Sequence, residues 1–259
     1  MSDVKPPFFI LGCVRSGTTL LRDVLRLHPD LICPEETHFF RWGDPFGTPR
    51  YDHPYIKNAP IRKQREMDGI SDYEARICLK LSWDRKELAN GYAHLYAQKI
   101  GRQGARWFDK TPQNVYGILL ISSLFPDAKF IHIHRNPLNV VTSLLQGKVM
   151  PVHPLKGAIN YWTESMRILT EYTAAWPERV LHVPYERFTR EPTSELQRIC
   201  RFLGEDAGQI VLPEDWIHPE KNRYTEVLTR EEMALVIEKC EPFWSRFGYR
   251  MDAGEANGS

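Results

Sequence analysis

The sequence predicts an α/β fold of three layers, in which a central parallel sheet of about four to five strands is flanked by helices. Two observations lead to this prediction. Short apolar runs of strand length alternate along the chain with longer segments of helical periodicity. The short runs are mainly apolar and show no alternation with polar residues over their whole length, which is typical of strands that helices cover on both faces of a parallel sheet.

Four short runs are expected to form the strands. They span residues 8–12, 106–109, 129–134 and 179–183. The first, third and fourth runs are each followed by a turn and then by a helical pattern, which is the order of elements in a parallel sheet with helical crossovers.

The helices are expected at residues 18–27, 115–125, 137–146, 155–176 and 194–203, and from Thr229 to about residue 243. Asn136 is the expected N-cap of the third helix, since a proline follows it at the first helical position. Gly204 is a typical helix stop. Thr229 and Glu232 have the spacing of a capping box.

Residues 43–69 interrupt this rhythm, because they are rich in Pro, Gly, Asp, Tyr and basic residues. We expect a long loop here, which is either part of a lid over a functional site or a solvated insertion. Residues 1–250 are expected to form one domain with an insertion at about 41–72. The tail at 251–259 is expected to be disordered.

The bulk composition is that of an ordinary globular protein, with 42% hydrophobic and 26% charged residues. A net charge of +1 gives no global attraction to nucleic acid, and the basic stretch at 57–65 is expected to be solvated surface. The five cysteines form no CxxC pair, so neither a zinc site nor a disulfide framework is indicated. No run approaches the ~20 apolar residues of a membrane span, and we expect a cytoplasmic protein.

The first strand runs into a glycine-bounded loop, Gly-Cys-Val-Arg-Ser-Gly-Thr-Thr at 12–19, and a helix begins at once. Backbone amides of such a loop and the positive end of the helix dipole bind phosphate. The loop nearly matches the nucleoside-triphosphate motif, but Thr18 occupies the lysine position and the basic residue is Arg15. An anion with fewer phosphates is therefore indicated; the alternative is a plain turn before a helix.

A second basic residue with a nearby hydroxyl follows the strand at 129–134. Arg135 stands at the strand's carboxyl end, where open α/β sheets bind ligands, and Ser143 lies two turns into the next helix. Together they can hold a second phosphate. A magnesium-dependent nucleotide enzyme would want an acidic residue after this strand, but the strand ends in a basic one.

These two segments together resemble the cofactor motifs of sulfotransferases that use 3′-phosphoadenosine-5′-phosphosulfate (PAPS). GCVRSGTTLL at 12–21 is similar to their 5′-phosphosulfate loop, and FIHIHRNPLNVVTSLL at 130–145 to their 3′-phosphate segment. HVPYERFTREP at 182–192, RICRFLG at 198–204 and FGY at 247–249 resemble later landmarks of the family. The resemblance covers residues from about 8 to 250 and implies a P-loop-like fold. Val14 departs from it, since many members have proline there.

The closest likeness within the family is to tyrosylprotein sulfotransferases and their bacterial relatives. RSGTTLLRDVLRLHPDLICPEETHFF at 15–40 has their spacing, which implies that Glu36 is the catalytic base. FDKTPQN at 108–114 implies that Lys110 stabilises the departing phosphate oxygen. The resemblance assigns the following cofactor-binding residues: Arg15, Ser16, Gly17, Thr18 and Thr19 for the 5′-phosphate, Arg135 and Ser143 for the 3′-phosphate, with Tyr185 and Arg223 nearby.

The expected reaction is transfer of a sulfuryl group from PAPS to a hydroxyl, leaving 3′-phosphoadenosine-5′-phosphate (PAP), without a metal. The acceptor stays open: a phenol, a sugar, a lipid, a carrier-bound group or a peptide tyrosine. The insertion at 41–72 would lie on the acceptor side. His38 is an alternative base, and Glu35 and Glu36 could instead begin a surface helix. A P-loop nucleotide kinase and an inactive nucleotide-binding module are the alternative functions.

Overall fold

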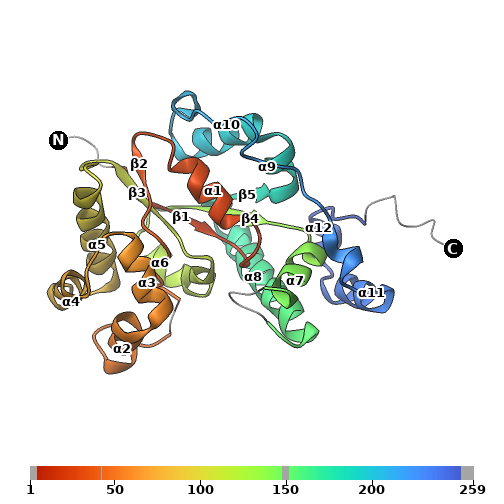
Figure 1. Cartoon of the computed structure of the whole chain (residues 1–259), viewed down its shortest axis with the longest axis horizontal. Helices are drawn as coiled ribbons and strands as arrows, with labels where there is room; N and C mark the ends of the chain where they lie inside the picture. The colour runs from red at the N-terminus through yellow and green to blue at the C-terminus, as the bar shows by residue number, and fades with distance from the viewer. Residues whose placement is uncertain (1–4, 42, 148–151, 252–259) are drawn as a thin grey trace.

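The computed structural model describes residues 5–41, 43–147 and 152–251 (Figure 1). Its centre is one sheet of five parallel strands in the order β2-β3-β1-β4-β5. The strands are β1 (Phe8–Leu11), β2 (Leu31–Ile32), β3 (Arg106–Lys110), β4 (Lys129–His134) and β5 (Val180–Pro184). The predicted fold class is therefore confirmed. All four predicted strands are present, and the short β2 was not predicted.

The middle strand, β1, supplies side chains to the cores on both faces of the sheet. Phe8 pairs in register with Phe108 of β3 on one side and with Lys129 of β4 on the other. Successive side chains point to opposite faces, so Phe8 and Ile10 join one hydrophobic cluster while Phe9 and Leu11 join another. Because all five strands run in parallel, their carboxyl ends lie along one edge of the sheet.

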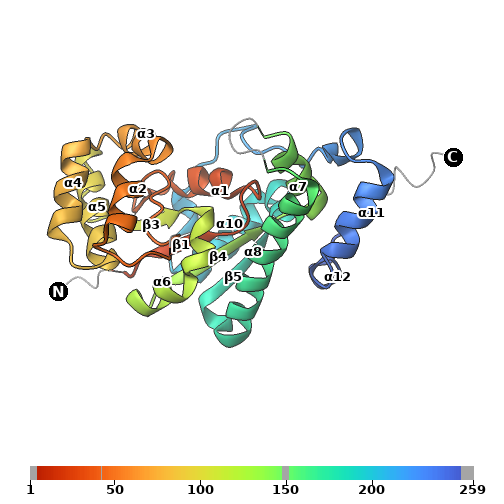
Figure 2. The same cartoon turned by 90° about the horizontal axis from the view of Figure 1, so that it is seen from below.

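Helices cover both faces of the sheet (Figures 1 and 2). One layer contains α1 (Thr18–Leu25), α9 (Tyr185–Arg190) and α10 (Pro192–Leu203), and the other contains α6 (Ile118–Leu124) and α8 (Leu155–Ala175). A third cluster, around the buried Trp162, joins α8 to α7 (Pro137–Leu145), α11 (Arg230–Lys239) and α12 (Phe243–Arg246). The predicted helices are confirmed with shifted ends. The last one stops at Lys239 rather than near 243, since Pro242 has no amide hydrogen to continue it.

The prediction of a long loop at 43–69 is wrong. This stretch contains α2 (Pro49–Lys57) and α3 (Ala59–Met67), and α4 (Asp72–Leu81) and α5 (Arg85–Lys99) follow. Pro49 begins α2 at a position where proline is tolerated, and the helix buries Tyr51 and Tyr55, one turn apart. The basic stretch at 57–65 is also not uniformly solvated. Arg65 is buried, and its guanidinium lies 5.1 Å from the centre of the Tyr55 ring.

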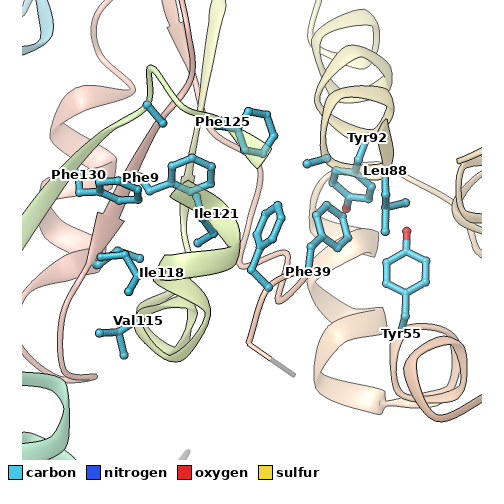
Figure 3. Close-up of a cluster of buried hydrophobic side chains, with 14 of the residues drawn as sticks. Phe9, Phe39, Tyr55, Leu88, Tyr92, Val115, Ile118, Ile121, Phe125 and Phe130 are labelled. Carbon is cyan, nitrogen blue, oxygen red and sulfur yellow. The ribbon is translucent and has the colours of Figure 1, made fainter. Parts of the chain in front are cut away.

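An aromatic cluster joins helices α2–α5 to the sheet (Figure 3). Phe39 lies 5.6 Å from Tyr55 and 5.4 Å from Tyr92, measured between ring centroids. The next residue, Phe40, lies 5.9 Å from Phe9 of β1. Two consecutive side chains therefore anchor the segment after residue 36 to both parts of the core, which fixes the position of that segment.

Three histidines are packed together inside the protein, on β4 and β5. Nδ1 of His132 lies 2.9 Å from Nδ1 of His182, and Nδ1 of His134 lies 2.5 Å from the Tyr249 hydroxyl. Burial lowers the pKa of His134 to about 3 and that of His182 to about 4, and lowers that of His132 well below its usual value. His132 and His134 are thus buried, His182 is partly buried, and all three are hydrogen-bonded.

We expect this cluster to destabilise the protein as the pH falls below 6.5. Below this pH the histidines of the unfolded chain bind protons, whereas those of the folded protein stay neutral. Each such histidine therefore lowers the free energy of unfolding by about 1.4 kcal/mol for every pH unit between its pKa in the unfolded chain and its pKa in the folded protein. Burial raises the pKa values of Asp68 and Asp109 to about 6, so folding takes up protons there and partly offsets the loss below pH 6.

Urea unfolding at several pH values tests the histidine contribution. The free energy of unfolding should depend less steeply on pH between 6.5 and 4 in His182→Asn than in the unmodified protein. The exposed His94 provides a control, since His94→Asn should leave the slope unchanged. An unchanged slope in His182→Asn would contradict the expectation.

Candidate active site

A cleft of about 830 Å³ lies at the carboxyl edge of the sheet, a volume typical of sites for small-molecule ligands. Its lining comes from the segments after all five strands, from α7 and from the segment 218–223. Eight of the residues assigned from the sequence line it: Arg15, Thr18, Thr19, Glu36, Arg135, Ser143, Tyr185 and Arg223.

The turn after β1 has the form of an anion-binding loop. Gly17 has φ of 90° and caps α1, and a β-carbon there would overlap the Tyr185 ring. Arg15 also adopts a left-handed conformation, with φ of 69°. The fully buried Ser16 has a hydroxyl with no hydrogen-bond partner among the described residues. Such an orphan hydroxyl beside the amides of a helix start suits a bound oxyanion.

A lysine at the end of β3 connects the two sides of the cleft. Lys110 is 1% exposed, and its ammonium forms an ion pair with Glu36 Oε1. The same ammonium donates a hydrogen bond to the Thr19 hydroxyl in the first turn of α1, at 3.3 Å. Lys110 therefore lies between the carboxylate and the anion-binding loop.

Contacts on either side of Glu36 hold it in place. Its neighbour Glu35 forms ion pairs with Arg22 and Arg26 of α1. Burial alone would raise the pKa of Glu35, but the two guanidiniums outweigh it, so that the pKa is lowered. No helix forms at 33–41, which rules out the alternative that Glu35 and Glu36 begin a surface helix.

The other neighbour, Thr37, is tied to the end of β3. Its hydroxyl donates to the buried Asp109 at 2.5 Å, and its amide donates to the Thr111 hydroxyl at 3.0 Å. Asn114 donates to the second oxygen of Asp109 at 2.9 Å. These bonds connect the segment of Glu36 to the segment of Lys110, so the ion pair is held by backbone that is itself hydrogen-bonded.

His38 is placed less favourably than Glu36. It is 4% exposed and does not line the cleft, although its Nε2 lies 3.7 Å from Glu36 Oε2. Burial, with added repulsion from Arg41 and Lys110, lowers its pKa to about 3. The imidazole is therefore neutral at pH 7 and lies behind the carboxylate.

The second predicted anion site adjoins the first. Arg15 Nε donates to the Ser143 hydroxyl of α7 at 2.8 Å, and Arg135 donates to the Arg15 carbonyl at 2.9 Å. The Arg135 guanidinium lies 4.8 Å from the centre of the Tyr185 ring and forms an ion pair with Glu220. Two cations, a hydroxyl and an aromatic ring thus gather where β4 ends.

Sequence reasoning missed several residues of the cleft. Thr142 lies next to the predicted Ser143, and Gln113 belongs to the FDKTPQN segment, so their neighbours could have indicated them. The Thr142 hydroxyl is buried and has no hydrogen-bond partner in the described part of the chain. Glu220 and Lys221 carry no pattern that could have placed them here.

Two features are absent from residues 5–41, 43–147 and 152–251. Within these ranges, no three His, Cys, Asp or Glu side chains are grouped in a way that could bind a metal ion. None of the helices there has both the length and the apolar character that a membrane crossing requires. All five cysteines are free thiols.

Comparison with known proteins gives consistent results. Residues 6–208 match the family model described as "Sulfotransferase family". A putative protein-tyrosine sulfotransferase of Caenorhabditis briggsae is 27% identical over 221 residues, which cover 82% of this chain and 70% of the relative. The chain spans only about half the length of several other protein-tyrosine sulfotransferases that it matches.

Solved structures share the fold. The sulfotransferase domain of the Synechococcus PCC 7002 olefin synthase has a TM-score of 0.66 at 24% identity, covering 96% of this chain and 98% of the domain. A mouse sulfotransferase complexed with PAP has a TM-score of 0.51 at 13% identity, covering 95% of this chain and 85% of that structure.

Proposed function

The chain belongs to the sulfotransferase family, and on this premise we propose that it transfers a sulfuryl group from PAPS to a hydroxyl acceptor. One observation carries the proposal. A single cleft is lined by two adjoining sites suited to anions and by Glu36, whose carboxylate forms an ion pair with the buried Lys110. Transfer from a phosphosulfate needs binding sites for the nucleotide phosphates, a base for the acceptor and a cation for the leaving group.

The residues of the cleft fit PAPS, which carries phosphates at two separate positions. The loop at Arg15–Thr19 would hold the 5′ end, where the Ser16 hydroxyl lacks a partner among the described residues. Arg135 and Ser143 would hold the 3′-phosphate through a guanidinium and a hydroxyl. When bound, PAPS supplies the sulfuryl group and a phosphate as the leaving group.

Glu36 is the proposed general base. An alcohol or phenol is a weak nucleophile until its proton is removed, and a positioned carboxylate can accept that proton. Glu36 lines the cleft, whereas His38 does not, which favours Glu36 as the base. The hydrogen bonds at Thr37 and Glu35 would keep the carboxylate oriented while it accepts the proton.

Lys110 is the proposed partner of the leaving group. Negative charge develops on the bridging oxygen as the bond to sulfur breaks, and a cation that is already in place stabilises it best. Its ammonium lies within hydrogen-bond distance of Thr19 in the phosphate loop, and so close to where a 5′-phosphate would bind.

The acceptor, the domain boundaries and the location of the protein in the cell remain proposals. The matched relatives include protein-tyrosine sulfotransferases, so a peptide tyrosine is a candidate acceptor, alongside the phenol, sugar, lipid and carrier-bound hydroxyls that the sequence leaves open. A single domain over 1–250, a role of 41–72 in covering the acceptor, and a cytoplasmic location remain predictions. The predicted disordered tail at 251–259 lies, apart from Met251, outside the described residues.

Calorimetric titration with PAP, and with ATP plus magnesium for comparison, tests the proposal. PAP should bind, and Arg15→Ala and Arg135→Ala should each weaken binding about 10- to 100-fold, since each removes charge-assisted hydrogen bonds. Arg201→Ala is the control, because Arg201 is exposed on α10 and does not line the cleft. Binding of ATP and magnesium but not PAP would instead favour a P-loop kinase.

A further inference from the structure

The guanidinium of Arg135 is engaged by an acidic side chain of the protein itself. NH2 donates to Glu220 Oε1 at 2.8 Å, and Nε pairs with Glu220 Oε2. NH1 donates in the other direction, to the Arg15 carbonyl. A guanidinium can bind a carboxylate or a phosphate through two parallel hydrogen bonds at either of two edges, Nε with NH2 or NH1 with NH2, and here NH1 already donates to the Arg15 carbonyl. Glu220 therefore occupies the edge that a 3′-phosphate would use.

Glu220 reaches this position from an otherwise exposed part of the chain. Residues 211–219 are exposed or only partly buried, whereas the Glu220 side chain is 11% exposed. The chain is held again just beyond it, where Asn139 of α7 donates to Asn222 at 2.7 Å and Tyr224 is buried. For the Glu220 side chain to leave Arg135, its bonds to that guanidinium and to the Lys221 amide would have to break, but these anchors would not.

The surroundings favour an exchange of anions at this point. Lys221 and Arg223 follow Glu220 closely in the chain and also line the cleft, as does Arg15. A phosphate carries more negative charge than a carboxylate and offers more acceptor oxygens, so it gains more from this group of cations. The same cations would retain a phosphate after Glu220 had moved away.

We propose that Glu220 sets the affinity for the cofactor by competing with its 3′-phosphate for Arg135. The inference rests on the proposed function, since it takes Arg135 as the 3′-phosphate residue. On binding, the phosphate replaces the carboxylate at the guanidinium, and on release of PAP the carboxylate returns. A nucleotide without a 3′-phosphate, such as 5′-AMP, leaves the ion pair intact and is not subject to this competition.

Titration of three proteins with PAP and with 5′-AMP tests the inference. Glu220→Gln keeps the shape of the side chain but removes its charge, and it should bind PAP about tenfold more tightly, with slower dissociation, because one charge-assisted pair no longer opposes binding. Its affinity for 5′-AMP should change much less. Glu226→Gln is the control, because Glu226 is exposed in the same segment and does not line the cleft.

Each outcome has a distinct meaning. If Glu220→Gln binds PAP no more tightly than the unmodified protein does, the inference is overturned while the proposed function stands. If Glu220→Gln gains affinity equally for PAP and 5′-AMP, or if Glu226→Gln gains as much as Glu220→Gln, the gain comes from the change in net charge alone. Either result would also overturn the inference. Failure of the unmodified protein to bind PAP would overturn the proposed function, and the inference with it.

Discussion

Replacing Glu36 with glutamine is expected to slow sulfuryl transfer by a factor of 10² to 10⁴, the range that general-base catalysis typically contributes. Glutamine preserves the length and shape of the side chain but cannot accept the acceptor's proton. The affinity for PAP should not fall, because the carboxylate repels a phosphate and the substitution removes that repulsion. The measurement is PAP release from PAPS, assayed against a panel containing a phenol, a sugar and a tyrosyl peptide.

The adjacent Glu35 offers a matched control for this substitution. Glu35→Gln weakens the ion pairs to Arg22 and Arg26 and should lower the melting temperature, but it leaves the proposed base in place. Its rate should therefore fall far less than that of Glu36→Gln. If Glu36→Gln retains at least a tenth of the activity, Glu36 is not the base, and the same assay on His38→Gln becomes the next test.

The sheet could be predicted because buried parallel strands leave a strong local signal. The run at β1 is apolar throughout, those at β4 and β5 are mostly apolar, and all three are followed by clear helix starts, so the layers follow from the chain order. The helices α2–α5 have no such signal. Pro54 lies inside α2, and Tyr73 and Leu81 of α4 face solvent, so the residues that do reach the core, such as Tyr51 and Tyr55, are not set apart by a clear helical pattern.

The same contrast applies to the cleft. Lys110 ends a strand, Arg135 directly follows one and Arg15 lies in the loop after β1, and strands that run in parallel must bring those positions to one edge. Their meeting could therefore be expected before the structure. Glu220 lies 85 residues beyond Arg135, in a segment without helix or strand periodicity, and only the folded chain brings the two together. Its place in the cleft depends on long-range contacts that no local pattern records.

Replacing Lys110 with methionine is expected to lower the rate of transfer by about 10² to 10³, the usual cost of removing one group that stabilises developing negative charge. Methionine fills the space of the lysine stem, and Glu36 retains 22% side-chain exposure, so its carboxylate can be hydrated when its partner is lost. The fold should therefore be largely preserved. Kinetics under saturating PAPS, together with the melting temperature, distinguish a loss of catalysis from a loss of folding.

The double variant tests whether the two residues act as one unit. Glu36 and Lys110 are in direct contact, and effects of substitutions at contacting catalytic groups are generally not additive. Glu36→Gln with Lys110→Met should thus be about as slow as the slower single variant, and not slower by the product of both losses. Fully multiplicative losses would mean that base and leaving-group stabiliser work independently. Activity of Lys110→Met within tenfold of the unmodified protein would leave the loop amides and Arg15 as the groups that stabilise the departing phosphate.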